Sequence, residues 1–342
     1  FCYLHAGKSK AGIKESKVME SRQIDILALT QEEIFSALSL ELSYQGKQIF
    51  QALHRELVPG FNEITTLPKK LRENLTEGFS LPFVKPEKRS LDRDGTLKLL
   101  LRLYDGLAVE AVLLRDDRGR ATACLSSQAG CAMGCKFCKT ATMGLKRNLL
   151  AGEMVDQFRS LLKEEGQINN IVFMGMGEPL SNYENLSRAI GILHTPEAYN
   201  LGYRRITIST AGYIPGILKL AAEGPPVGLA VSLNSADPDI RRELMPITRS
   251  HPLTELKEAL EEYQRITDRR ITFEWVLLSG INSSDREIEL LKGFLKNLKA
   301  SINLIPWNRI HSFPFREPDS RETEEFYNKL LTLGIPITRR FR

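Results

Sequence analysis

The last two thirds of the sequence alternate between short strand-like runs and longer helix-like stretches, and this alternation restricts the fold more than any other feature. The strand-like runs are ATACLSS, NNIVFMG, RRITIST, VGLAVSL, ITFEWVLL, SINLIPW and IPITRRF. The helix-like stretches between and after them are 153–165, 182–194, 253–266, 286–299 and 321–333. Such alternation predicts an α/β fold with a parallel sheet, closed or partly closed into a barrel. Reactive residues of such folds lie at the C-terminal ends of the strands.

The first third is organised differently. Residues 31–80 repeat apolar residues every three to four positions, which predicts helices. Residues 80–95 are rich in Pro, Gly and charge and are expected to form a linker. Two strand-like runs then meet at Asp105-Gly106, which indicates a β-hairpin. The expected parts are an N-terminal extension at 1–30, a helical accessory domain at 31–95, a β-hairpin extension at 96–116 and the α/β core at 117–342.

Composition excludes some classes of protein. The sequence contains no run of about 18 apolar residues, so we expect no membrane-spanning helix. The opening FCYLHAGKSKAGIKESK lacks the features of a secretory signal. Because Met19 starts a more ordinary opening, residues 1–18 are expected to be non-native or poorly ordered. The net charge of +5 suits a nucleic-acid partner and equally a plain solvated surface. The cysteine usage suggests a reducing compartment, so we expect the protein in the cytoplasm.

Three of the five cysteines, Cys131, Cys135 and Cys138, stand in a C-x3-C-x2-C pattern. Zinc sites generally combine two pairs of ligands. The histidines supply no second pair, and they are His5, His54, His194, His251 and His311. Three thiolates in one tight loop instead suit an iron–sulfur cluster with one iron open to a substrate or cofactor. The competing interpretation is three buried structural cysteines that happen to be neighbours.

With the aromatic Phe137 before the last cysteine, this spacing resembles the signature of the radical S-adenosylmethionine (SAM) superfamily. The resemblance implies a 4Fe–4S cluster held by the three cysteines, with SAM chelated to the open iron. It further implies one-electron cleavage of SAM to a 5′-deoxyadenosyl radical. The fold it implies is a partial (β/α)6 barrel, which agrees with the alternation of strands and helices.

Longer motifs narrow the resemblance to the RlmN/Cfr family of RNA adenine methyltransferases. They are CLSSQAGCAMGCKFCKTATMGLKRNL, VFMGMGEPLSNYENL, RRITISTAGYIPGI, LAVSLNSADPDIRRELMPI and INLIPWN. The resemblance runs from about Gln31 to Arg342, and it implies that the helical part is an RNA-engaging accessory domain. The implied reaction is methylation of an adenine ring carbon, carbon-2 in the RlmN type, in 23S ribosomal RNA and probably tRNA. We further expect the enzyme to be a monomer and to receive its electron from a reductant such as flavodoxin or ferredoxin.

The resemblance also implies roles for single residues. Cys124 matches a cysteine that frees a covalent protein–RNA adduct by forming a disulfide, and Glu110 matches the acceptor of the adenine proton. Taken alone, Cys124 could be a small buried strand residue and Glu110 an exposed glutamate on a strand. The implied SAM contacts are Gly177, Glu178, Ser209, Ser232, Leu233, Asn234 and Asn308. A carboxylate beside a glycine suits an ammonium group, whereas the other residues could also be polar caps at strand ends.

Two further groups of residues bear on RNA binding. Basic residues in and after the cysteine loop could steer phosphates or form a solvated rim, and they are Lys136, Lys139, Lys146 and Arg147. Three aromatic residues of the helical part are expected in its core rather than as base-stacking platforms, and they are Tyr44, Phe50 and Phe61.

The end of the sequence departs from the family pattern. Relatives continue after a TRR-like strand into a segment with a methyl-accepting cysteine, whereas this sequence ends at ITRRFR with no cysteine after Cys138. Cys2 is a poor substitute, because it lies in the opening segment. Either the sequence is a fragment or the acceptor is lost, so the chain as written is expected to bind cluster and SAM without methylating RNA. A radical SAM enzyme with another substrate and a non-catalytic, cluster-bearing RNA-binding relative are the alternatives.

Overall fold

The computed structural model describes residues 25–79, 81, 84–116 and 118–339. The expected extension at 1–18 and Cys2 therefore lie outside the described residues. In the part of the chain that is described, we find no helix with the length and apolar character needed to cross a membrane.

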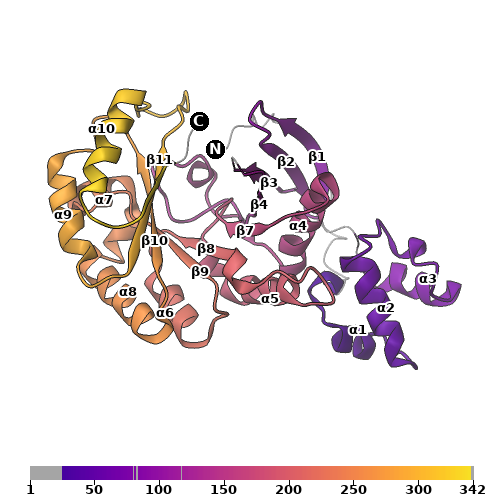
Figure 1. The fold of residues 1–342 in the computed structure, drawn as a ribbon. Helices are drawn as coiled ribbons and strands as arrows, with labels where there is room; N and C mark the ends of the chain where they lie inside the picture. The colour runs from indigo at the N-terminus through magenta and orange to yellow at the C-terminus, as the bar shows by residue number, and fades with distance from the viewer. Residues whose placement is uncertain (1–24, 80, 82–83, 117, 340–342) are drawn as a thin grey trace.

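One twisted sheet forms the centre of the molecule, with strand order β1-β2-β3-β4-β7-β8-β9-β10-β11-β12 (Figure 1). Its strands are β1 (Val84–Leu91), β2 (Leu97–Leu103), β3 (Ala108–Arg115), β4 (Ala121–Cys124), β7 (Asn170–Phe173), β8 (Ile206–Thr210), β9 (Gly228–Ser232), β10 (Ile271–Leu277), β11 (Ala300–Pro306) and β12 (Ile337–Arg339). Strands β1 to β4 pair antiparallel, and every pairing from β4 to β12 is parallel. Because β1 and β12 stand at opposite ends of this order, the barrel is open, and the predicted α/β partial barrel is confirmed.

Helices connect the parallel strands and cover the outer face of the sheet (Figure 1). They are α4 (Ala151–Glu165), α5 (Tyr183–His194), α6 (Ile214–Glu223), α7 (Pro238–Leu244), α8 (Leu253–Thr267), α9 (Asp285–Leu295) and α10 (Ser320–Leu331). The N-terminal helices α1 (Gln31–Ala37), α2 (Ser43–His54) and α3 (Lys69–Gly78) gather at one end of the molecule (Figure 1).

Alternate residues of β10 show how each parallel strand divides its side chains between two faces. Phe273 and Trp275 point outward and pack on the covering helices, with ring centroids 5.8 Å from Phe294 and 5.7 Å from Phe326. Val276, the next residue, points the other way and lines a cavity inside the barrel. The period of two therefore separates the packing face from the face that builds the site.

Two expectations about the N-terminal part are wrong. The stretch 84–91 is no linker but strand β1, which makes the hairpin an antiparallel three-stranded edge. Its side chains are mostly exposed, and Pro86 stands at a break in the ladder register, so its composition resembles that of a loop. Tyr44 is not in the core, because 55% of it is exposed, whereas Phe50 and Phe61 are buried as expected.

Buried polar contacts of helix α4 attach the N-terminal part to the core. Arg159 donates from Nη1 to Oδ1 of Asp156 (2.7 Å) and from Nη2 to the carbonyl of Val58 (3.0 Å). The other carboxylate oxygen of Asp156 accepts from the backbone N–H of Val84 at 3.0 Å. Both side chains are buried, so one ion pair joins the helical region, strand β1 and the barrel.

We predict that Asp156→Ala destabilises the protein by about 3–5 kcal/mol, because it leaves the guanidinium of Arg159 buried without its carboxylate. Urea unfolding followed by circular dichroism measures the loss. The matched control is Glu325→Ala, which breaks an ion pair with side chains 87% exposed for Arg321 and 58% for Glu325. The control should change the free energy of unfolding by less than about 1 kcal/mol. Equal losses in the two variants would contradict this account of how the parts are joined.

Candidate active site

The loop that carries the three clustered cysteines is closed at its base. A two-stranded sheet of β5 (Gln128–Ala129) and β6 (Arg147–Asn148) joins its two ends. Gly130, just inside this sheet, has a φ of +80°, and a Cβ at this position would lie 1.8 Å from the carbonyl oxygen of Gly144. Only glycine fits here, because any side chain would meet backbone. The cysteines therefore lie in a closed loop that follows the C-terminal end of β4.

An apolar cluster at the open end of the barrel supports this loop. Its buried members are Leu244, Met245, Ile247, Leu278, Trp307 and Ile310. Cys135 and Phe137 of the loop pack against it. The backbone N–H of Lys136 donates to the carbonyl of Leu244 at 2.9 Å, and Nε1 of Trp307 donates to the carbonyl of Phe137 at 3.0 Å. The loop is thus fixed to helix α7 and to the end of β11.

The three thiols influence one another electrostatically. Burial and, to a smaller extent, the charge of Cys138 raise the pKa of Cys131 to about 11. Burial, together with Cys138 and Cys131, raises the pKa of Cys135 still more. Without a metal Cys131 and Cys135 would stay protonated at neutral pH, whereas binding to iron requires thiolates.

The donor set fits an iron–sulfur cluster better than a single metal ion. Among the described residues no three His, Cys, Asp or Glu side chains form a group that could hold one metal ion. A 4Fe–4S cluster does not need such a group, because each cysteine binds a different iron. Three half-buried thiols on one closed loop fit that requirement.

Beside the cysteine loop lies a cavity of about 250 Å³. It brings together four of the predicted site residues from distant parts of the chain, namely Glu110 of β3, Cys124 of β4, Cys138 of the loop and Asn308 after β11. Its other walls are mainly apolar and include Val112, Leu114, Val172, Met174, Val276, Ile305 and Trp307. Apolar walls with a few convergent polar groups are typical of small-molecule sites.

Glu110 is the most unusual group in this cavity. It is 7% exposed, and its Oε2 atom is buried without a hydrogen-bond partner among the described residues. The alternative of an exposed strand glutamate is therefore wrong. Ser126 holds the backbone here by donating from Oγ to the carbonyl of Glu110 at 2.6 Å. A buried carboxylate oxygen without a partner is costly unless a ligand supplies one.

Gly177 and Glu178 form a tight connection between β7 and the barrel rim. Gly177 has a φ of +106°, and a Cβ there would lie 2.6 Å from the Cβ of Gln128. The carboxylate of Glu178 accepts from the backbone N–H groups of Ala211 (2.7 Å) and Leu180 (3.2 Å). Burial raises the pKa of Glu178 to about 7, although these hydrogen bonds lower it. The side chain thus braces the ends of β7 and β8 against each other.

The remaining predicted contacts lie on β8 and β9 or after them. Ser209 and Ser232 are half-buried, and neither lines the cavity described above. Asn234 adopts the left-handed conformation with a φ of +61°. Its Oδ1 accepts from the N–H of Val276 at 2.8 Å, and its Nδ2 donates to the sulfur of Met245 at 3.2 Å. Its amide is therefore occupied within the protein, and the side chain of Leu233 is fully buried.

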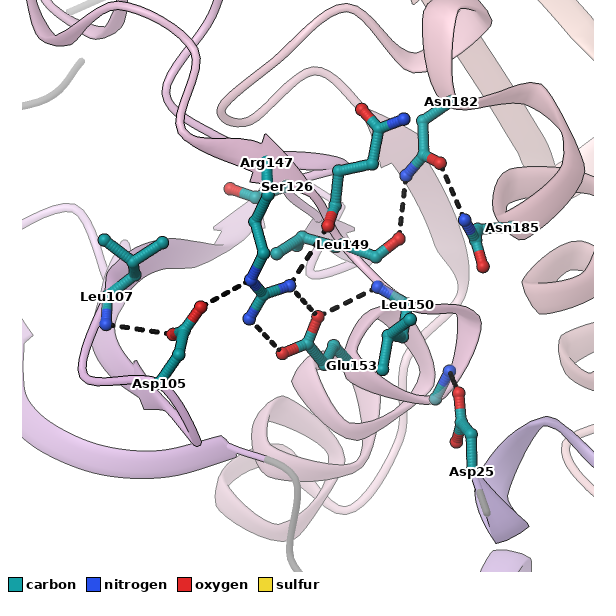
Figure 2. Close-up of polar contacts among 12 residues, drawn as sticks. Asp25, Asp105, Leu107, Ser126, Arg147, Leu149, Leu150, Glu153, Asn182 and Asn185 are labelled. Atoms are coloured by element: carbon teal, nitrogen blue, oxygen red, sulfur yellow. Dashed lines mark hydrogen bonds and ion pairs between the residues drawn. The ribbon is translucent and has the colours of Figure 1, made fainter. Parts of the chain in front are cut away.

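Arg147 was one of four basic residues that could steer RNA phosphates. For Arg147 this expectation is wrong, because its guanidinium is bound to two carboxylates of the protein. Figure 2 shows its guanidinium between Asp105, at the β2–β3 turn, and Glu153, at the start of α4. The distances are 2.5 Å from Nε to Asp105 and 2.7 Å from each terminal nitrogen to Glu153. The guanidinium also lies over the ring of Tyr104, 4.8 Å from its centroid. Arg147 therefore anchors the cysteine loop to the hairpin and to α4.

Asp25 completes this network on the other side of α4 (Figure 2). Its Oδ2 accepts from the N–H of Gly152 at 2.7 Å, and its Oδ1 is buried with no partner among the described residues. Burial and, to a smaller extent, the charges of Glu153 and Asp156 raise the pKa of Asp25 to about 6.

Two findings complete the comparison of site and sequence. No disulfide joins any two cysteines in the described part of the chain, so the disulfide implied for Cys124 is not present here. Sequence reasoning also missed Arg241, which is fully buried beside the ends of β8 and β9. Its only signal was its place within the motif LAVSLNSADPDIRRELMPI.

Comparisons with known proteins agree with this site. The Radical SAM superfamily model matches residues 125–291. The chain is 44% identical over 324 residues to the probable dual-specificity RNA methyltransferase RlmN of Moorella thermoacetica, covering 92% of each chain. It is 38% identical to the dual-specificity RNA methyltransferase RlmN of Syntrophotalea carbinolica, over 94% of this chain and 86% of that one. A crystal structure of a radical SAM methyltransferase from Sphaerobacter thermophilus superimposes with a TM-score of 0.88 at 42% identity, covering 92% and 94%.

We predict that Asp25→Asn stabilises the protein at pH 7 by on the order of 2 kcal/mol and flattens its pH dependence. The pKa of about 6 in the folded state exceeds the ordinary value, so the folded state binds the proton more tightly. Stability should accordingly rise as pH falls from 7 to 5, and the variant should lose this rise. Urea unfolding at both pH values measures it, with Asp239→Asn, whose side chain is 79% exposed, as control. A parent protein that gains no stability between pH 7 and pH 5 would refute the prediction.

Proposed function

The chain belongs to the RlmN family of radical SAM RNA methyltransferases, and we propose that it methylates carbon-2 of an adenine in 23S ribosomal RNA and tRNA through a methyl-cysteine intermediate. Family membership makes it a SAM-dependent transferase that acts on RNA and uses a 4Fe–4S cluster and SAM. The choice of RNA, the ring carbon and the covalent intermediate belong to the proposal.

The observation that carries the proposal is the single cavity that Glu110, Cys124, Cys138 and Asn308 share. Carbon-2 of adenine is not nucleophilic, so its methylation needs a radical source close to a base and a thiol. The cavity supplies this combination, because a cluster cysteine, a buried carboxylate and a second thiol line the same space. Its mainly apolar wall suits a nucleobase and excludes water.

Glu110 and Cys124 would act from neighbouring strands. Val112 pairs with Cys124 in the antiparallel register of β3 and β4, and Glu110 lies two residues before Val112 on the same face. The unpartnered carboxylate oxygen of Glu110 is suited to accept the proton from carbon-2. The thiolate of Cys124 would form a disulfide with the sulfur that carries the base. The S–C bond that breaks would leave its electron pair on the methylene carbon, which would take up a proton and become the methyl group.

The cofactors would be held at the rim of the barrel. Cys131, Cys135 and Cys138 would bind the cluster, which supplies the one-electron chemistry that makes SAM a source of a carbon radical. Glu178, with Gly177, would hold the ammonium group of SAM, and Ser209, Ser232 and Asn308 would complete its pocket. Leu233 and Asn234 would contribute their backbone, since the side chain of Leu233 is buried and the amide of Asn234 is bonded to Val276 and Met245.

The same proposal covers the partners. The helical part of the expected accessory domain, residues 31–79, would engage RNA, because residues 84–91 belong to the central sheet. Lys136 and Lys146, both exposed on the cysteine loop, would meet phosphates. A flavodoxin or ferredoxin would deliver the electron to a monomeric enzyme. We place this activity in the cytoplasm, where both RNA substrates and reduced thiols are found.

We predict that replacing Cys131, Cys135 or Cys138 by Ala abolishes binding of the cluster, because each would remove one of three protein ligands. Anaerobically reconstituted parent protein should hold about four irons and absorb broadly near about 400 nm. Iron and sulfide analysis measures the effect, and Cys124→Ala is the matched control, which should keep the full cluster. Zinc without labile sulfide in the parent protein would contradict the assignment of a 4Fe–4S cluster.

We predict further that Glu110→Gln lowers methylation by about 10²–10⁴-fold, because it removes the proton acceptor. Cys124→Ala should accumulate a covalent protein–RNA adduct. The assay uses protein expressed from the complete gene, with 23S ribosomal RNA or tRNA digested to nucleosides for mass spectrometry. Glu87→Gln, a change of an exposed glutamate on β1, is the control. Undiminished 2-methyladenosine with Glu110→Gln, or methylation only at carbon-8, would contradict the proposal.

A further inference from the structure

Arg241 is a fully buried cation whose hydrogen-bond acceptors are all neutral. Its Nε donates to the carbonyl of Leu233 at 3.1 Å, and its Nη1 donates to Oγ1 of Thr248 at 2.7 Å. Its Nη2 donates to the carbonyls of Ala211 at 2.9 Å and Ser232 at 3.4 Å. The guanidinium thus ties the ends of β8 and β9 to helix α7.

Two other arginines, the buried Arg159 and the partly buried Arg147, have acidic partners. Arg159 pairs with Asp156 at 2.7 Å, and Arg147 pairs with Glu153 at the same distance. No ion pair within the described residues involves Arg241, whose burial lowers its pKa only to about 10, so it stays charged at neutral pH. A buried charge without a counter-charge costs several kcal/mol. Its presence calls for a negative group that binds nearby.

The cysteine loop is the negative group that the fold brings close. Leu244, the last residue of the helix that carries Arg241, accepts from the N–H of Lys136, and its apolar cluster includes Cys135. A thiolate at Cys135 and the guanidinium of Arg241 would stabilise each other electrostatically. The carboxylate of Glu178 accepts from the backbone N–H of Ala211, whose carbonyl accepts from Arg241. Binding of a cluster would convert Cys135 to a thiolate, which the guanidinium of Arg241 would then complement.

We propose that Arg241 is a positioning residue that balances the negative charge of the cluster and raises its reduction potential. This inference rests on the proposed function only in assigning the cluster to the three cysteines. One-electron reduction adds a negative charge, which a fixed buried cation stabilises more than it stabilises the oxidised form. Because the donors of Arg241 already point at protein oxygens, it acts through its charge and through the strand ends that it holds.

The test is a redox titration of the reconstituted holoprotein without SAM, followed by electron paramagnetic resonance. Arg241→Met removes the positive charge. At a fixed potential it should lower the ratio of reduced to oxidised cluster by about tenfold, which corresponds to a reduction potential about 59 mV lower for one electron. Arg241→Lys keeps the charge and should restore most of the ratio. Arg242→Met is the matched control, because the neighbouring side chain is 51% exposed and pairs with Asp239. It should leave the potential unchanged.

An unchanged potential in Arg241→Met, or equal shifts in the Met and Lys variants, would overturn the inference, since charge would then have no part. If Arg241→Met does not bind a cluster, the amount of cluster that each variant binds is measured instead of the reduction potential. Uptake by Arg241→Lys alone supports the inference, and failure of both variants contradicts it. The proposed function fails separately, if protein expressed from the complete gene has the expected potential but does not methylate RNA.

Discussion

The parallel pairing from β4 to β12 is the constraint on which the site depends, because it turns the C-terminal ends of all these strands to one edge. The cysteine loop follows β4, the Gly177–Glu178 segment follows β7, Asn234 follows β9, and Asn308 follows β11. None of these residues is near the others in sequence. The antiparallel edge adds the remaining group, since the register of β3 against β4 brings Glu110 to the same cavity as Cys124.

Buried polar and charged groups that lack a partner help to locate the ligand-binding site. Away from the cavity, the buried Asp156 and Glu153 are matched by Arg159 and Arg147. At the cavity, Glu110 keeps a buried oxygen without a partner, and beside the cysteine loop Arg241 keeps its charge without an acid, within the part of the chain that is described. Such groups are expensive in an empty protein and become favourable when a ligand complements them. The arrangement therefore supports the proposed roles, in which Arg241 complements a charged cofactor and Glu110 accepts a proton.

Much of this was predictable from sequence, and the failures have physical causes. Strand–helix alternation predicted the barrel because its apolar runs have a clear period, and the cysteine spacing predicted the loop. Strand β1 was missed because an edge strand with exposed side chains has the composition of a linker. Arg241 and Arg242 are adjacent and identical in type, yet one is fully buried and the other exposed. Only the packing of α7 against the ends of β8 and β9 buries Arg241 and leaves Arg242 exposed. The sequence does not show this packing, because it brings together segments that are distant in the chain.

The central claim is that cluster, SAM and target base meet in the cavity lined by Glu110, Cys124 and Cys138. The most direct measurement is iron-edge anomalous diffraction from crystals of the anaerobically loaded protein with SAM. The account predicts an anomalous peak bonded to the sulfurs of Cys131, Cys135 and Cys138, with SAM reaching from it into this cavity. An iron peak elsewhere, or SAM bound away from Glu110 and Cys124, would contradict the account.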